Sequence, residues 1–128
     1  MTEDLWPVDL QPVQPVRTPV GLLKEQAALL GPKTDNILEA YVSTHKLEVK
    51  FGDESFWTRF LIVAPTLEYH YEVFSITYGI TLYPVRTESG EILNDENELK
   101  SFLQRQLQSD KTRKVVGALI AQVRDQSA

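Results

Sequence analysis

A histidine lies between two carboxylates in residues 67–83, the one stretch of the chain whose polar side chains have a spacing that suggests chemistry. Glu68, His70 and Glu72 alternate with apolar residues, so a β-strand here would place all three on one face, about 6.6 Å apart. Such a group could ligate a metal ion or act as a base, as in a small metal-dependent hydrolase centred on His70. The spacing is wide for one ion, and a metal site needs further ligands. We therefore expect no metal or cofactor here, but a solvated face whose charges pair with neighbouring strands.

Other catalytic patterns are absent from the sequence. There is no glycine-rich phosphate loop, no nucleophile elbow and no zinc-binding spacing. The chain has no cysteine, which excludes disulfides, thiolate metal sites and cysteine nucleophiles. The acidic clusters at 53–54 and 95–98 are explained by a turn and by the start of a helix. We expect a protein that is not an enzyme and has no catalytic residues.

The elements that would position these side chains follow from apolar periodicity. Apolar residues occupy odd positions from Leu67 to Val73 and even positions from Phe74 to Leu82. Alternation of period two predicts strands with one solvated face. We expect a four-stranded antiparallel sheet within residues 36–86, with strands from about 36, over 56–64, over 67–77 and up to 85.

Three helices are predicted outside the sheet. Thr18 and Pro19 are typical of a helix start, and Gly31-Pro32 of a helix end, so the first helix should cover 19–30. A C-terminal pair should cover 95–108 and 111–124. Strands in succession with helices at both ends indicate an α+β fold, with the helices mainly on one face of the sheet. We expect one domain over residues 19–128.

Residues 1–18 form an arm in which proline precedes valine at Pro7, Pro12 and Pro15, and the pair recurs directly after it at Pro19. Proline fixes φ and favours extended geometry before it, so this Pro-Val arm should be extended. Leu5 and Trp6 make it more apolar than a purely solvated tail. It could pack on its own domain or on a partner. Residues 12–17 also fit a PxxP ligand ending in arginine.

Charge is unevenly distributed along the chain. The net charge is −5: residues 1–99 hold 7 Lys and Arg against 16 Asp and Glu, and residues 100–128 hold 6 against 2. An acidic protein is a poor general ligand for nucleic acid. The predicted C-terminal helix pair nevertheless resembles a helix-turn-helix, in which Lys111, Arg113 and Lys114 could meet phosphates. A nucleic-acid-associated regulator is therefore an alternative, although a plain αα-hairpin has the same pattern.

The remaining features favour a soluble binding protein. No apolar run approaches the ~18 residues of a membrane span, and the N-terminus lacks the apolar region of a secretory signal, so we expect a cytoplasmic protein. We expect a non-enzymatic protein–protein interaction domain: a small adaptor, a chaperone-like subunit or an immunity-type inhibitor. Its partner would be another protein or a second copy of itself. The expected contacts are Leu5 and Trp6 in the arm, and Trp57, Glu68, His70 and Glu72 on the uncovered sheet face.

Overall fold

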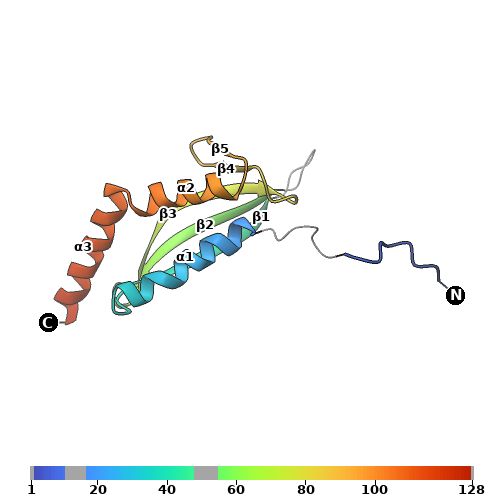
Figure 1. Cartoon of the computed structure of the whole chain (residues 1–128). Coiled ribbons are helices and arrows are strands. Elements are labelled where there is room, and N and C mark those ends of the chain that lie inside the picture. Colours follow the sequence, from blue (N-terminus) through green and yellow to red (C-terminus); the bar gives the residue numbers. More distant parts are fainter. Residues whose placement is uncertain (1, 11–16, 48–54, 128) are drawn as a thin grey trace.

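The computed structural model describes residues 2–10, 17–47 and 55–127 of the chain (Figure 1). Within these ranges, helices flank a run of strands, so the predicted α+β class is confirmed. The sheet has five strands, not the four expected. The elements in chain order are α1 (Pro19–Lys33), β1 (Glu39–Leu47), β2 (Ser55–Ala64), the 3₁₀ turn η1 (Pro65–Leu67), β3 (Tyr69–Gly79), β4 (Val85–Thr87), β5 (Ile92–Leu93), α2 (Glu96–Leu107) and α3 (Asp110–Ser127).

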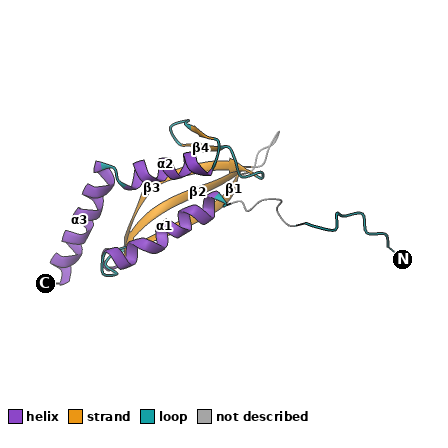
Figure 2. Cartoon of the chain, in the orientation of Figure 1, coloured by secondary structure: helices purple, strands orange, loops and turns teal. Residues whose placement is uncertain are grey.

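The sheet is an antiparallel meander in which the strands lie side by side in the order of the chain. The helices gather on one side of it, as Figures 1 and 2 show. Helix α1 packs on β1 and β2, and α2 packs on β3 and β5. Helix α3 contacts η1 and α2 at one end of the sheet. The described helices thus cover one face and leave the other open.

The predicted fourth strand is the main error of the sequence analysis. Residues 80–84 turn instead of extending: Leu82 has a positive φ of 79°, and its amide donates to the carbonyl oxygen of Gly79 at 3.0 Å. The alternation of apolar residues therefore continues in the sequence to Leu82, although the strand itself ends at Gly79. Pairing resumes only in β4, which is three residues long, and β5 has two residues, too few to show a periodicity.

The helix ends differ from prediction by a few residues. The Thr18 hydroxyl caps α1 as expected, accepting from the Gly21 amide at 2.9 Å. The helix continues through Pro32, however, because proline removes only one amide donor from its last turn. It ends where Asp35 and Asn36 take positive φ. The C-terminal pair occupies 96–107 and 110–127 in place of 95–108 and 111–124.

A β-bulge in β3 explains the change of parity in its sequence. The β2–β3 register pairs Phe60 with Phe74 and Leu61 with Glu72, so Val73 is the additional residue. Before the bulge, odd residues of β3 face the helices. After it, even residues do, and Phe74 stacks on Phe60 with ring centroids 5.3 Å apart. One extra residue therefore keeps apolar side chains inward along all of β3.

The core consists of two apolar clusters between the helices and the sheet. The larger joins α1, α2 and the middle of the sheet, and includes Leu23, Phe60 and Leu99. The smaller joins α3 to the end of β2 through Ile62 and Leu119.

A chain of hydroxyls crosses the larger cluster. Thr58, fully buried, lies 3.0 Å from the Thr44 hydroxyl and 3.1 Å from the Tyr78 hydroxyl. These bonds satisfy polar groups that would otherwise be costly inside an apolar layer.

We predict that Thr58→Val destabilises the fold by about 1–3 kcal/mol, because it leaves the buried Tyr78 hydroxyl without its partner. Thr44→Val is the matched control: Thr44 is exposed, and Thr58 keeps its bond to Tyr78, so the loss should stay below about 1 kcal/mol. Urea unfolding measures both. Equal losses of unfolding free energy in the two variants would show that the Thr58–Tyr78 hydrogen bond does not carry the predicted stabilisation.

Candidate functional site

The open face of the sheet carries a row of aromatic and charged side chains across three strands. Residues directly opposite one another in an antiparallel pair point to the same side. His45 pairs with Trp57, and Ser43 pairs with Arg59, which in turn faces Ser75. Trp57 and Arg59 are half-buried, and they belong to neither core cluster. Their neighbours in the sheet cover them in part, and no helix of the described residues lies on this face.

Contacts between side chains join this row into one array. The Arg59 guanidinium lies 5.2 Å from the centroid of the Trp57 ring and forms an ion pair with Glu72 on β3. The His45 ring, directly across on β1, is 5.7 Å from the Trp57 ring between centroids, and its Nε2 is 3.0 Å from the Ser43 hydroxyl. We call Ser43, His45, Trp57, Arg59 and Glu72 the cross-strand array. Because each member has a partner, the array presents a preorganised surface to a ligand.

An apolar strip runs beside the array. Tyr41 is 53% exposed and lies opposite Leu61, and Val63 continues the strip on β2. The Tyr41 hydroxyl donates to the Glu39 carboxylate at 2.9 Å, and this bond raises the pKa of the phenol. A hollow of about 210 Å³ lies against the array, between Trp57 and Arg86. The face thus combines aromatic, apolar and charged groups with a small hollow.

The structure separates the three residues of the expected polar stripe. His70 and Glu72 lie on the open face, opposite Val63 and Leu61. Glu68 does not: it ends η1 with a positive φ of 51°, one residue before β3 begins. The prediction that all three share one face of a strand is therefore wrong for Glu68. Within the described residues, no three His, Asp or Glu side chains lie close enough together to hold a metal ion.

The described part of the Pro-Val arm, residues 2–10, leaves its apolar side chains in solvent. Trp6 is 74% exposed and Leu5 84%, and neither a helix nor a strand forms there. The segment extends away from the domain in Figure 1. The predicted PxxP pattern at 12–17 lies outside the described residues apart from Arg17.

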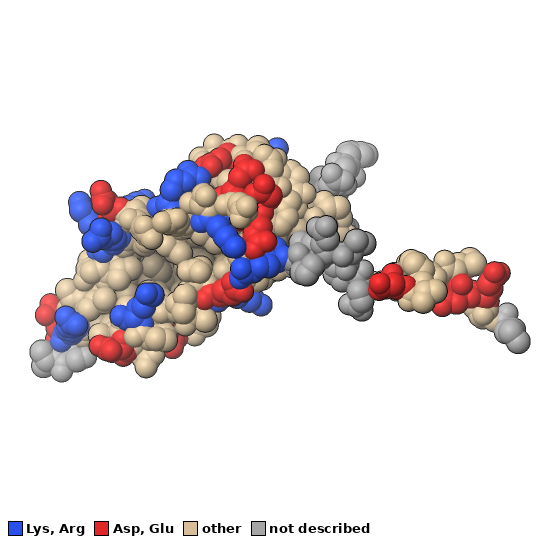
Figure 3. All heavy atoms as spheres, viewed as in Figure 1, with Lys and Arg blue, Asp and Glu red and all other residues tan. Residues whose placement is uncertain are grey.

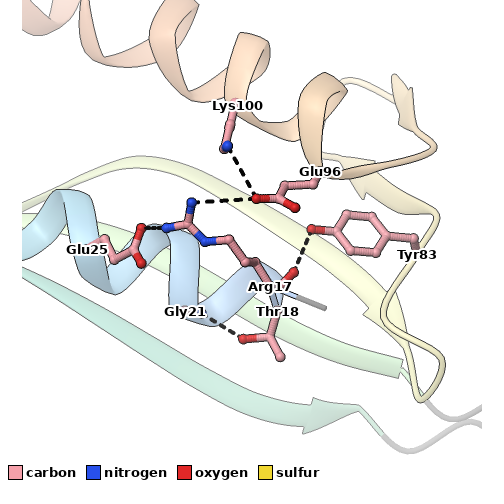
Figure 4. Close-up of polar contacts among 7 residues, drawn as sticks. All are labelled: Arg17, Thr18, Gly21, Glu25, Tyr83, Glu96 and Lys100. Atoms are coloured by element: carbon pink, nitrogen blue, oxygen red, sulfur yellow. Dashed lines mark hydrogen bonds and ion pairs between the residues drawn. The ribbon is translucent and has the colours of Figure 1, made fainter. Parts of the chain in front are cut away.

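The root of the arm is fixed to the domain at Arg17 (Figure 4). Its guanidinium forms an ion pair with Glu25 of α1, and lies 3.5 Å from Glu96 of α2. Lys100 approaches the same Glu96 oxygen at 3.2 Å. The Tyr83 hydroxyl donates to the Arg17 carbonyl oxygen at 3.0 Å. These contacts tie α1, α2 and the β3–β4 turn together where the arm begins.

The surroundings of Tyr83 in this junction shift the pKa of its phenol. Burial raises the pKa of its phenol above the ordinary value of 10.0, and the carboxylates of Glu96 and Asp95 raise it further. The positive charge of Arg17 acts in the opposite direction. The protonated phenol, which is the form that donates to the Arg17 carbonyl, is thus favoured by folding.

The three basic residues of the nucleic-acid alternative are exposed in the first turns of α3. In Figure 3, blue side chains gather where α2 meets α3, while the described arm shows red and tan atoms but no blue. The Ser109 hydroxyl accepts a hydrogen bond from the Thr112 amide at 3.1 Å and so caps the start of α3. Lys111, Arg113 and Lys114 are thereby brought together at one end of the molecule.

Comparison with known proteins places the chain in no family. No protein-family model matches it, and neither a curated protein nor a solved structure shows significant similarity to it. Among the described residues, no helix has the length and apolar character needed to cross a membrane.

Sequence analysis identified Trp57, His70 and Glu72 on the open face but missed Arg59, His45 and Tyr41. Arg59 could have been found, because it lies two residues after Trp57 on the same predicted strand and must share its face. His45 and Tyr41 depend on the register of β1 against β2, which the spacing of apolar residues does not determine.

We predict that the Arg59–Glu72 pair contributes a coupling free energy of about 0.5–1 kcal/mol in a double-mutant cycle with Arg59→Met and Glu72→Gln. The Arg105–Glu91 pair, 2.7 Å apart but with side chains 56% and 40% exposed, is the matched control and should couple more weakly. Urea unfolding of the single and double variants gives both values. An equal or stronger coupling at Arg105–Glu91 would contradict the rigidity assigned to the array.

We predict that Tyr83→Phe costs about 0.5–1.5 kcal/mol at neutral pH, since it removes the hydrogen bond to Arg17. Because the folded pKa of Tyr83 is raised, its contribution is fully present below the ordinary pKa of about 10 and is lost as the pH rises through the folded value. Unfolding measured from neutral to alkaline pH should therefore show a steeper loss above about pH 10 in the unmodified chain than in the variant. If the stability of the two proteins fell in parallel with pH, the protonated Tyr83 hydroxyl would not stabilise the fold through its bond to Arg17.

Proposed function

We propose that this chain is a non-enzymatic protein-binding domain that contacts its partner through the open face of the sheet. The carrying observation is the cross-strand array: a tryptophan in contact with an arginine and a histidine on a face that no described helix covers. Tryptophan, tyrosine and arginine are the residues that most often dominate binding energy at protein interfaces. Trp57, Arg59 and Tyr41 supply all three types within one surface.

The surroundings of the array suit a protein partner better than a small molecule. The adjacent hollow, about 210 Å³, is smaller than the roughly 300–1,000 Å³ usual for small-molecule sites. The strip of Tyr41, Leu61 and Val63 supplies apolar area, and the ends of the face carry polar groups such as Glu39 and His70. An apolar centre with a polar rim is the usual anatomy of such interfaces.

The Pro-Val arm is the second contact in this proposal. Its described residues expose Leu5, Trp6 and Leu10 to solvent, which is a cost unless a partner covers them. The junction at Arg17 fixes the point where the arm leaves the domain. The uses that fit best are a small adaptor, a chaperone-like subunit or an immunity-type inhibitor. A cysteine-free chain is suited to the reducing cytoplasm, which we propose as its compartment.

We predict that a photo-crosslinking amino acid at Tyr41 captures one recurrent protein in the cells that make this chain. The same probe at Leu29, which is 48% exposed on α1, should not capture it. Once the partner is purified, Trp57→Ala should weaken binding by about 2 kcal/mol or more, roughly thirtyfold. Capture from Leu29 with none from Tyr41 would contradict the proposed surface.

A further inference from the structure

The helix-covered face of the sheet has a gap at the beginning of β3. A groove of about 550 Å³ lies there, which is within the range of about 300–1,000 Å³ usual for ligand sites. Tyr69 and Tyr71 form one wall, and Val115, Ala118 and Leu119 of α3 form the other. Tyr69 is 48% exposed. The groove is therefore apolar, aromatic and open to solvent.

The same part of β3 has an unpaired outer edge. Strand β4 pairs only with Ile76, Thr77 and Tyr78, so no described strand covers the edge from Tyr69 to Ser75. An unpaired edge offers backbone donors and acceptors to an extended peptide. Groove and edge together form a site for one added strand, with alternate side chains entering the groove.

The arm has the alternation that such a site requires. The described arm bends at Trp6 and Val8, and the Trp6 amide donates to the Asp4 carboxylate at 3.0 Å. Straightened along a strand edge, it would point Trp6, Val8 and Leu10 to one side, and Leu5, Pro7 and Asp9 to the other. All three residues of the first set are exposed apolar side chains. Pro7 has no amide hydrogen, so the arm can pair with β3 only in a register that turns this position away from the edge, where an edge strand tolerates proline.

Charge complements this fit. The described arm holds Glu3, Asp4 and Asp9 and no cation. Lys111 lies one helical turn before Val115, and Lys114 one turn before Ala118, so exposed cations border the groove. An acidic segment entering from this end meets opposite charge.

The arm of the same molecule leads away from the groove in Figure 1, where residues 2–10 extend from the domain on the side opposite α3. To enter its own groove the arm would have to reverse direction, and only the residues before Leu10 could reach it, because Leu10 is seven residues from Arg17 and can span at most roughly 25 Å. Arg17 is held at the Gly79 end of β3 through Tyr83, and Tyr71 is eight strand residues away, roughly 26 Å. Helix α2 packs on β3 at Phe74, between these points. A second copy has no such restriction.

We propose that two copies of the chain exchange arms, each laying residues 5–10 along the β3 edge and into the β3–α3 groove of the other. A two-fold axis would make both exchanges equivalent and close the assembly as a dimer. The inference rests on the proposed function in that it takes the arm as a contact, but it assigns that contact to a second copy of the chain and leaves the open sheet face available to a different protein.

Sedimentation equilibrium of the full chain tests the exchange. We expect a dimer that is weakened roughly tenfold or more by Val8→Asp, which would bury a charge, and by Ala118→Arg, which fills the groove. The controls are Leu5→Asp, on the other side of the arm, and Ala121→Arg, exposed on α3 outside the groove, and both should remain dimers. A chain that is monomeric at every concentration, or a dimer indifferent to the first two variants, would overturn the proposal.

Cysteine pairs identify the occupant directly, since the chain has no cysteine of its own. Mixing a Val8→Cys chain with an Ala118→Cys chain and adding a thiol oxidant, which accepts the two electrons as the two thiols lose their protons, should give a disulfide-linked heterodimer. A chain carrying both substitutions that closes on itself as a monomer would show that the arm binds in cis, and the exchange would be wrong. If no dimer forms but the photo-crosslinking probe at Tyr41 still captures its partner, the arm exchange is wrong and the proposed function of the open face stands.

Discussion

The bulge at Val73 is the constraint on which the two faces of this protein depend. It lets β2 pair with both halves of β3 while the apolar side chains of β3 change from odd to even positions. Without the extra residue, one half of β3 would turn its apolar side chains to solvent. With it, Tyr69 and Tyr71 face α3, Phe74 and Ile76 enter the core, and Glu72 meets Arg59 on the opposite side.

The two faces that result differ in character. The covered face is a packed layer, apart from the gap where α3 leaves Tyr69 and Tyr71 accessible. The open face is held in place by contacts between side chains of neighbouring strands, among them those of Trp57 with Arg59 and His45. The arm adds a third element, because the contacts of Arg17 with α1, α2 and Tyr83 fix its point of departure. Binding groups thus lie on both sides of one sheet.

Local periodicity was sufficient to predict the fold class. The helices and the strand over 56–64 have regular apolar spacing. The change of apolar side chains from odd to even positions in β3 could also be seen in the sequence, but the bulge at Val73 that causes it could not. The predicted fourth strand failed because Leu82 takes a turn conformation that apolar spacing does not encode. The prediction that Glu68 lies on the strand failed for the same reason: the apolar alternation extends past it in the sequence, but its backbone takes left-handed geometry. The array could be predicted only in part, because the contact of His45 with Trp57 depends on a register set by tertiary pairing.

The central claim is that the open face binds another protein, and hydroxyl-radical footprinting tests it most directly. The chain would be labelled in the cells that make it and again after purification, and the modification of individual side chains compared by mass spectrometry. The account predicts that Trp57 and Tyr41 are modified less in the cell than in isolation, while Leu29 on α1 is modified equally in both. Equal modification of Trp57 and Tyr41 in the two states would contradict it.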